Sequence, residues 1–431
     1  MKLLFAIICA FWAGLASAPA QMESGFIPLF DGNTLDGWKL VGKSGNGYAV
    51  TNGAIYCSTG ESGNLSTEKE YSDFVLRFEF KLSAGANNGI GIRAPYEGDA
   101  AYMGMEIQVL DDSAPQYVTL QPWQFHGSIY NIAAAKRGSL KPVGEWNTEE
   151  ISAIGRRIKV VVNGKTIVDA NLNNVTDPEI LRKHPGMFRD RGHIGFLGHG
   201  DYAEFRNLRI REIPAREKDN TPPEGFVALF NGNTLAGWKG LFAEPYDNPG
   251  KRATLAKAEL EKLQAKADER MREHWKAGNG QLNYDGHGDS LCTKNDYRDF
   301  EMLVDWKIPP RGDSGIYVRG SPQVQIWDPF TQPTRLGSEV GSGGLYNNKK
   351  NPSNPLKVAD KPIGEWNRFR IIMVGERVHV FLNGELVARD TVLENYWERD
   401  KPIYPSGDIQ LQNHSDPLWF KNIYIRELPV K

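Results

Sequence analysis

Cysteine is scarce in this chain, which has three in 431 residues. Cys9 falls in an apolar run near the N-terminus, and Cys57 and Cys292 stand at positions that do not match between the two halves described below. A disulfide framework is therefore not what holds the fold together. The chain also has no large excess of positive or negative charge, since its formal net charge is -2. That balance gives no reason to expect a nucleic acid or an anionic membrane as a partner.

Long apolar runs are absent beyond the N-terminus. The first residues combine Lys2, an apolar run from Leu3 to Leu15, and the small residues Ala18-Pro19-Ala20. This order is typical of a signal peptide at residues 1–20, cleaved after Ala20, and the run is short for a membrane span. A buried N-terminal helix is the alternative. We therefore expect an exported protein, periplasmic or extracellular, whose mature chain has no membrane span.

What the chain does have is internal similarity. Five segments recur in the same order and at similar spacing: Phe26–Lys39 with Phe226–Lys239, Tyr71–Leu82 with Tyr297–Ile308, Gly89–Arg93 with Gly315–Arg319, Lys141–Asn147 with Lys361–Asn367, and Gly192–Pro214 with Gly407–Pro429. Such a pattern indicates two tandem copies of one domain. We predict a first domain at residues 21–213, a linker at 214–225 that contains Thr221-Pro222-Pro223, and a second domain at 226–431.

Both copies alternate apolar and polar residues in the manner of strands with one buried face. Phe74, Leu76, Phe78, Phe80 and Leu82 alternate with mostly polar neighbours, as do Phe300, Met302, Val304, Trp306 and Ile308. Asn163-Gly164 and Asn383-Gly384, each between apolar runs, predict hairpin turns. Short strands at regular spacing with such turns predict an all-β chain of two tandem β-sandwiches.

One segment departs from this pattern. Residues 252–277 contain no glycine or proline, and a single stripe at helical spacing carries Leu260, Leu263, Ala267, Met271 and Trp275. The stripe predicts a helix inserted in the second copy that covers its sandwich. A helix that forms a dimer is the alternative.

The alternation of apolar and polar residues also predicts which polar side chains lie on the face of the sheet opposite the core. Because Ile90 and Ile92 point inward, Arg93 is expected to point outward, and Arg319 by the same rule. The same face is expected to carry Glu106, Gln108, Gln323, Gln325, Gln410 and Gln412. Other candidates near it are His126, Tyr130, His199, Tyr346, His414 and Asp328.

Side chains of these types suit sugar recognition. Carboxamides, an acid and arginines pair with hydroxyl groups, and aromatic rings cover the apolar side of a pyranose. An antiparallel sheet commonly has one wet face, which explains any single residue of the set equally well. The set recurs in both copies, so we predict a binding face. Asp111 and Asp328 have a second interpretation as turn caps.

A pair of carboxylates suited to ordinary glycoside hydrolysis is missing. Glu106 and Asp111 are an odd number of positions apart, hence on opposite faces of one strand. The second copy has Gln323 where the first has Glu106. No Ser-His-Asp order, zinc-binding His-Glu-x-x-His or phosphate-binding loop is present. The residues alone therefore predict a sugar-binding face and leave catalysis open.

Several motifs together resemble the 3-keto-disaccharide hydrolase domain family. They are Leu29–Trp38, Asn88–Arg93, Glu106–Asp111 and Phe205–Leu208 in the first copy, and Asp313–Arg319, Gln323–Asp328 and Ile409–His414 in the second. The resemblance spans nearly all of the chain after residue 20. It implies a concanavalin A-like jelly roll, an exported location, and action on glycosides oxidised to a ketone at C3.

Such a substrate needs only one base, because a C3 ketone acidifies the proton on C2. The roles that the resemblance implies are catalytic for Glu106, His126, His199, Arg93, Arg319 and His414, and substrate-binding for Gln108, Tyr130, Gln323, Gln325, Asp328, Tyr346, Gln410 and Gln412. An arginine or a bound divalent metal ion would stabilise the enolate. The alternatives are a two-headed carbohydrate-binding protein without catalysis and a surface protein whose shared face meets another protein. The oligomeric state stays open.

Overall fold

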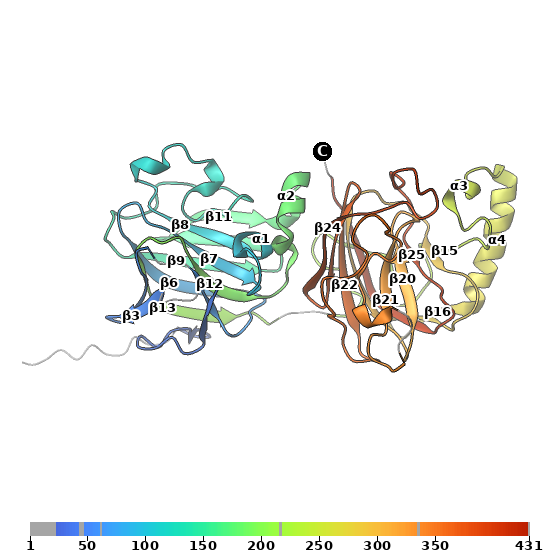
Figure 1. Ribbon diagram of the computed structural model, residues 1–431, viewed down its shortest axis with the longest axis horizontal. Coiled ribbons are helices and arrows are strands. Elements are labelled where there is room, and N and C mark those ends of the chain that lie inside the picture. The colour runs from blue at the N-terminus through green and yellow to red at the C-terminus, as the bar shows by residue number, and fades with distance from the viewer. Residues whose placement is uncertain (1–22, 43–46, 61–62, 215–217, 334–336, 430–431) are drawn as a thin grey trace, which may run out of the picture.

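The computed structural model describes residues 23–42, 47–60, 63–214, 218–333 and 337–429 (Figure 1). Its strands form four antiparallel sheets, two for each sequence copy, packed as two sandwiches. The predicted signal peptide and residues 215–217 of the predicted linker lie outside the described residues. Within the described part, no helix has the length and apolar character needed to cross a bilayer.

The first sandwich pairs a large sheet with a small one. The large sheet has the order β11 (Lys165–Asn171), β10 (Arg157–Val162), β9 (Asn147–Ile154), β6 (Phe74–Leu82), β13 (Ala203–Glu212), β4 (Ala54–Cys57) and β3 (Tyr48–Thr51), with β1 (Ile27–Pro28) beside β13. The small sheet has the order β2 (Trp38–Val41), β5 (Gly63–Thr67), β12 (His193–Gly198), β7 (Asn87–Ala94) and β8 (Met105–Leu110).

The second sandwich repeats this arrangement. Its large sheet has the order β16 (Trp275–Gly278), β17 (Gln281–Tyr284), β26 (Leu418–Glu427), β19 (Phe300–Lys307), β22 (Asn367–Val374), β23 (Arg377–Leu382) and β24 (Glu385–Val392), with β14 (Val227–Ala228) beside β26. Its small sheet has the order β15 (Trp238–Gly240), β18 (Leu291–Thr293), β25 (Gln410–Leu411), β20 (Asp313–Tyr317) and β21 (Gln323–Trp327). The predicted fold, two tandem concanavalin A-like jelly rolls, is confirmed.

Helices are few and lie outside the sheets. They are α1 (Ala100–Met103), α2 (Pro178–Lys183), α3 (Pro249–Arg252) and α4 (Lys257–His274), with 3-10 turns η1 (Pro115–Tyr117), η2 (Pro122–Gln124), η3 (Leu172–Asn174), η4 (Pro185–Phe188) and η5 (Ser338–Val340). The inserted helix is α4, which is shorter than predicted because β16 begins at Trp275. Ala267 and Met271 are the residues of its apolar stripe that are buried within it.

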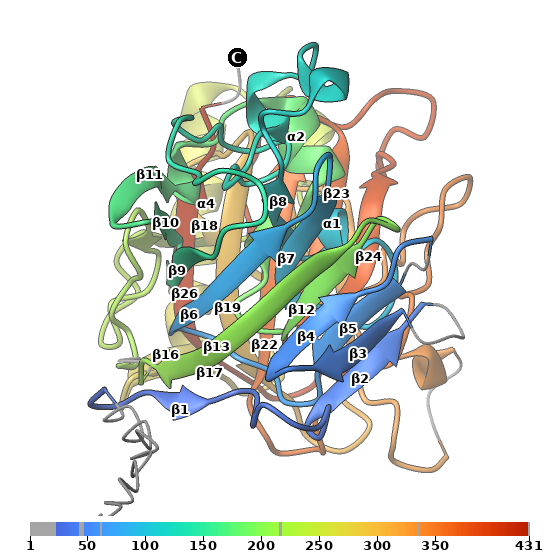
Figure 2. The same cartoon turned by 90° about the vertical axis from the view of Figure 1, so that its left-hand side faces the viewer.

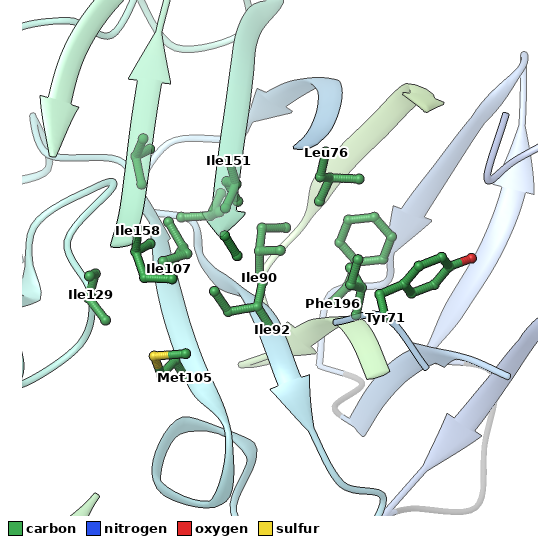
Figure 3. Packing of buried hydrophobic residues seen from close by; sticks show 14 of the residues in the cluster. Tyr71, Leu76, Ile90, Ile92, Met105, Ile107, Ile129, Ile151, Ile158 and Phe196 are labelled. Atoms are coloured by element: carbon green, nitrogen blue, oxygen red, sulfur yellow. The ribbon is translucent and has the colours of Figure 1, made fainter. Parts of the chain in front are cut away.

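The repeated opening phrase forms the same corner in both sandwiches. The indole of Trp38 donates to the Leu29 carbonyl (2.8 Å), and that of Trp238 donates to the Leu229 carbonyl (2.7 Å). Trp38 then packs on Phe196, with ring centroids 5.4 Å apart. The core between the two sheets of the first sandwich is drawn in Figure 3, where Ile90, Ile107 and Ile151 come from opposite sheets. The phrase therefore recurs because it anchors a tryptophan against each core.

The two sandwiches dock through a sheet of the second and the helical end of the first. Helix α2 lies between them, next to β22 and β24 (Figure 1), and Figure 2 shows the second sandwich behind the first. The outer side of the second large sheet adds Ile372, Val374 and Phe381 to the apolar cluster of the first sandwich. Asp190 of the first sandwich also pairs with Arg370 (2.6 Å). The docked face thus combines apolar contact with ion pairs.

Candidate functional site

The small sheet of the first sandwich turns polar side chains away from the core at β7 and β8. Along β8, Met105, Ile107 and Val109 are buried in the core, so Glu106 and Gln108 project from the opposite side. The register places Gly91 opposite Glu106 and Gly89 opposite Gln108. We call this surface the first polar face. Of the two glycines, Gly89 leaves room for the long side chain of Glu106.

Glu106 is the central group of the first polar face. The residue is 4% exposed, and its Oε1 atom has no hydrogen-bond donor among the described residues. A Cβ atom at Gly89 would lie 2.1 Å from this oxygen, so the glycine is what makes space for the carboxylate. Burial of a carboxylate oxygen without a donor is costly, which makes the position a candidate for ligand binding.

His199 stands beside this carboxylate. It follows β12, and its Nε2 atom lies 3.6 Å from Glu106 Oε1, a distance of ion-pair contact rather than of a hydrogen bond. The interaction with Glu106 raises the pKa of His199 above its usual value, against the opposing effect of burial. The side chain is 46% exposed. The carboxylate therefore favours the protonated form of the imidazole at the open side of the site.

Carboxamides and aromatic rings complete the first polar face. Gln108 Nε2 donates to Asn87 Oδ1 (2.6 Å). Residues 127–130 run along β8, and the Tyr130 amide donates to the Glu106 carbonyl (2.9 Å). This pairing puts the tyrosine ring on the same side as Glu106. The Trp123 ring meets it edge-on, with centroids 5.0 Å apart. An aromatic wall thus stands beside the acid and the amides.

The second sandwich builds a related surface, the second polar face, that is richer in amides. Gln323 Nε2 donates to Gln325 Oε1 (2.7 Å) and Gln412 Oε1 (2.8 Å), and Gln325 Nε2 donates to Asp313 Oδ1 (2.8 Å). Gln410 Nε2 instead donates to Asp408 Oδ1 (2.9 Å). His414 Nδ1 lies 3.4 Å from Asp313 Oδ2. Tyr346 is exposed and meets Trp327 edge-on, with ring centroids 5.4 Å apart.

The structure does not bring the two arginines to these faces. Arg93 is buried, where its guanidinium donates to the Gly155 carbonyl (2.7 Å) and to Asp73 Oδ1 (2.9 Å). Arg319 repeats this with Asp299 Oδ1 (3.0 Å). Both residues have positive φ, 50° and 53°, so the alternation that predicted outward side chains ends one residue earlier. Neither guanidinium lies where it would meet a ligand bound beside Glu106.

His126 is also placed away from the first polar face. It lies between the two sheets, 3% exposed, with its ring 5.0 Å from that of Phe80. Burial lowers its pKa to about 3, so the imidazole is neutral. Its Nε2 atom faces Glu149 Oε2 at 3.6 Å, and burial raises the pKa of that carboxyl well above its usual value. The neutral imidazole and this carboxyl group both belong to the core.

The two aspartates that end strands cap turns. Asp328 accepts from the backbone amides of Arg311 (2.6 Å) and Phe330 (2.8 Å), and Asp111 accepts from those of Gly85 (2.8 Å) and Ser113 (3.0 Å). Their oxygens are engaged by the protein itself. The interpretation of Asp328 as a turn cap therefore fits the structure better than substrate binding.

A cleft of about 660 Å³ lies elsewhere on the first sandwich, lined among others by Asp112, Arg137 and Lys141. Burial raises the pKa of Asp112, but its Oδ1 accepts from the His126 amide (2.9 Å) and its Oδ2 lies 3.7 Å from Arg137 Nε. These contacts hold the loop together. The cleft has no carboxylate with an unpaired oxygen comparable to Glu106, so we place the candidate site on the polar face.

Several residues of the two faces escaped the sequence analysis as site candidates. Asn87 and Asp313 stand two positions before Gly89 and Gly315, and the period of two would have placed them on the polar faces. Trp123 belongs to η2, in a long loop without periodicity, and carried no signal. In the part of the chain that the structure describes, no three or more His, Cys, Asp or Glu side chains form a group able to hold a metal ion.

Comparisons with known proteins identify the family of the chain. A model of the 3-keto-alpha-glucoside-1,2-lyase-like domain matches the chain twice, at residues 25–211 and 225–426. A 3-keto-disaccharide hydrolase of Bacteroides thetaiotaomicron is 26% identical over 228 residues, which are 44% of this chain and 79% of that protein. Two solved structures of Parabacteroides distasonis proteins with provisional glycosyl hydrolase names are 27% and 24% identical. They match 44% of this chain and 99% and 94% of their own, each with a TM-score of 0.40.

Proposed function

Because the chain belongs to the family of 3-keto-alpha-glucoside-1,2-lyase-like domains, we propose that its first sandwich cleaves glycosides that carry a ketone at C3. The observation that carries the proposal is the Glu106 carboxylate, which is buried with an unpartnered oxygen 3.6 Å from His199. A carboxylate in this state is a proton acceptor, and the imidazolium beside it is a proton donor.

The chemistry requires only these two groups. A ketone at C3 acidifies the C2–H bond, so a single base removes that proton and the electron pair forms an enolate. The enolate expels the group on C1 as the C1–O bond breaks, and the leaving oxygen takes a proton from an acid. Water then adds to C1 of the enone, and C2 regains a proton. The sum is hydrolysis of the glycosidic bond.

We assign the base to Glu106 and the acid to His199. Glu106 accepts the C2 proton, since its Oε1 atom has no competing donor among the described residues. His199 gives its proton to the leaving oxygen, and its raised pKa keeps that proton available at higher pH. During hydration the roles reverse, with neutral His199 accepting the proton of the attacking water and protonated Glu106 returning a proton to C2.

The remaining groups of the first polar face hold the sugar. Gln108 and Asn87 already share one hydrogen bond, which leaves the other amide atoms for hydroxyl groups. Tyr130 and Trp123 offer ring surface to the apolar side of the pyranose. Together they would hold the sugar with its C2–H bond pointing toward Glu106. Such positioning of the reacting groups raises the rate of proton transfer.

A second candidate function is carbohydrate binding without turnover. It is supported by the second polar face, where the Gln323 amide donates to both Gln325 and Gln412. We further propose export of the protein, supported by the signal-peptide pattern of residues 1–20. N-terminal sequencing of protein from outside the cytoplasm tests this, with a mature chain expected to start at Gln21.

The test of the enzymatic proposal uses 4-nitrophenyl 3-keto-glucosides of both anomers and the purified protein. Wild-type protein should release 4-nitrophenol with transient enone absorbance. Glu106→Gln should lower kcat on at least one anomer by about 10²- to 10⁴-fold, the usual contribution of a positioned base. Glu365→Gln makes the same chemical change at an exposed position and should leave kcat unaltered.

Calorimetry on the same samples separates the two candidate functions. Tight binding of the 3-keto-glucosides without release of 4-nitrophenol by the wild-type protein would favour the binding protein. Turnover that survives in Glu106→Gln on both anomers would remove this residue from the mechanism.

A further inference from the structure

At three corresponding positions the two polar faces carry carboxylate and carboxamide groups in a different order. The positions occupied by Asn87, Glu106 and Gln108 in the first sandwich correspond to Asp313, Gln323 and Gln325 in the second. At these three positions each face therefore has one carboxylate and two carboxamides. The carboxylate has moved from β8 to the strand that corresponds to β7.

The histidine has kept its place. His199 follows β12 and His414 follows β25, the corresponding strand. His414 lies 3.4 Å from the Asp313 carboxylate, and its side chain is 49% exposed. The Asp313 side chain is 12% exposed. Each sandwich thus has a histidine–carboxylate pair at the open side of its polar face.

The position that holds the base in the first sandwich has no such role in the second. Gln323 is an amide and has no basic oxygen for a proton, and its Nε2 atom also donates to the Ser314 carbonyl (3.2 Å). Tyr317 stands opposite Gln323, where the first sandwich has Gly91 opposite Glu106. A tyrosine side chain thus stands where the first sandwich has a glycine. The base in the second sandwich has to come from elsewhere on the face.

The aromatic wall is present in both sandwiches, although its tryptophan comes from different elements. Tyr346 corresponds to Tyr130, since the Gly343 amide donates to the Gln325 carbonyl (2.8 Å) just as the Gly127 amide donates to the Gln108 carbonyl (2.7 Å). Trp327, at the end of β21, stands against Tyr346. A sugar ring therefore has a comparable surface to lie on beside Asp313.

We propose that the second sandwich is a second active site in which Asp313 is the base and His414 the acid, and that the two sites act on opposite anomers. The inference rests on the proposed function. The backbone positions of the two carboxylates differ by one strand and four residues of register, yet both reach the equivalent histidine. The side chain of the base therefore approaches the acid from a different strand in each site.

The placement of the base relative to the acid matters because the two anomers orient the C1–O bond differently relative to the C2–H bond. The C2–H bond of a glucoside is axial. The C1–O bond is axial on the opposite side of the ring in an α-glucoside and equatorial in a β-glucoside. The base must lie beside the C2–H bond and the acid beside the C1–O bond, so their relative placement differs between the two anomers. Rates of proton transfer depend steeply on such alignment. One site geometry therefore favours one anomer, and the relocated carboxylate favours the other.

The experiment measures kcat/KM for 4-nitrophenyl 3-keto-α-glucoside and 3-keto-β-glucoside with full-length wild type, Glu106→Gln, Asp313→Asn and the double variant. We expect each single variant to lose at least 100-fold on one anomer and to stay within about twofold on the other, with the anomers exchanged between the two variants. The double variant should be inactive on both. Asp36→Asn, an exposed change of the same kind, is the matched control.

The outcomes separate this inference from the proposed function. If Glu106→Gln abolishes both activities and Asp313→Asn changes neither, the first site stands and the second site is refuted. Equal losses on both anomers in either variant refute the division by anomer. If the wild type turns over neither anomer, the proposed function itself falls. Thermal unfolding of every variant shows whether a loss of activity comes from misfolding. His414→Gln is a second variant of the same site and should reproduce the anomer-selective loss of Asp313→Asn.

Discussion

At the scale of single residues, one atom separates the two polar faces at the position of Glu106, because Gln323 has an amide nitrogen where Glu106 has an oxygen. Period-two alternation predicted that Glu106 and Gln108 face away from the core, since β8 is extended throughout. It failed for Arg93 and Arg319, whose positive φ values turn the side chain out of the series. It also had no means to place His126, which precedes a glycine with a φ of 76°.

Residue-scale chemistry predicts a pH dependence. Interaction with Glu106 raises the pKa of His199, so the imidazolium persists to higher pH than an isolated histidine. Because the acid form gives its proton to the leaving group, kcat should fall as pH rises through this raised pKa. His199→Gln should lower kcat by about 10²-fold or more and remove that alkaline limb.

NMR titration gives an independent measurement. The pKa of His199 should drop in Glu106→Gln, since the charge that favours the imidazolium is gone. An unchanged pKa would contradict the ion pair, whatever the activity data show.

At the scale of elements, turns and long strands were predictable and short irregular pieces were not. Asn163-Gly164 and Asn383-Gly384 form the hairpin turns expected of them, with positive φ at all four residues. The inserted helix was also predicted, but Trp275 fits both the helical stripe and the first position of β16, so the sequence could not locate the end. The 3-10 turns of the loop that supplies Trp123 have no periodicity to detect.

Helix α4 protects an edge strand, and this contact can be tested. The Gly240 amide donates to Asp268 Oδ1 (2.9 Å), and Gln264 Nε2 donates to the Gly240 carbonyl (3.0 Å). A Cβ at Gly240 would lie 2.2 Å from the Ala267 carbonyl oxygen. Gly240→Ala should therefore push the helix from β15 and lower the free energy of unfolding by about 1–3 kcal/mol.

Urea unfolding measures the effect, and the chain offers a matched control. Gly278 has no heavy atom within 4 Å of where its Cβ would lie. Gly278→Ala should therefore leave stability equal or slightly higher. Equal stability of both variants would show that α4 does not press on the strand.

At the scale of the whole molecule, the contact between the sandwiches centres on Glu301, which is fully buried. Arg370 Nη1 lies 2.7 Å from Glu301 Oε1, and Arg426 donates to Oε2. Arg156 of the first sandwich adds a third charge. Burial alone would raise the pKa of Glu301, but the three arginines outweigh it and hold the pKa at about 2. The repeat predicted two sandwiches, yet nothing in its pattern predicted this joint.

This carboxylate should make the protein acid-sensitive. The folded pKa is lowered from 4.5 to about 2, so the stabilisation is complete above pH 4.5 and is lost as pH falls toward 2. Glu301→Gln should lower the free energy of unfolding at pH 7 by about 3–5 kcal/mol, because it leaves three arginines without their shared partner. The variant should also lose part of its stability difference between pH 7 and pH 4.

Urea unfolding at both pH values tests this, with Glu365→Gln as the control for the charge removed. Small-angle X-ray scattering would show whether the sandwiches separate. A stability equal to that of wild type at pH 7 would mean that the joint does not depend on this charge.

The docking of the two sandwiches also has a consequence for assembly. It joins unlike surfaces, the helical end of one unit and the back of the next unit's large sheet, and a head-to-tail contact of this kind can extend into a filament. The back of the first sandwich's own large sheet has a different composition. It carries the ion pairs Arg77 with Glu150 (2.6 Å) and Arg206 with Glu79 (2.8 Å), where the second sandwich has Leu303 and Ile372 beside the ion pairs of Glu301. We therefore expect the back of the first large sheet to be a poorer docking surface for a further helical end than the back of the second.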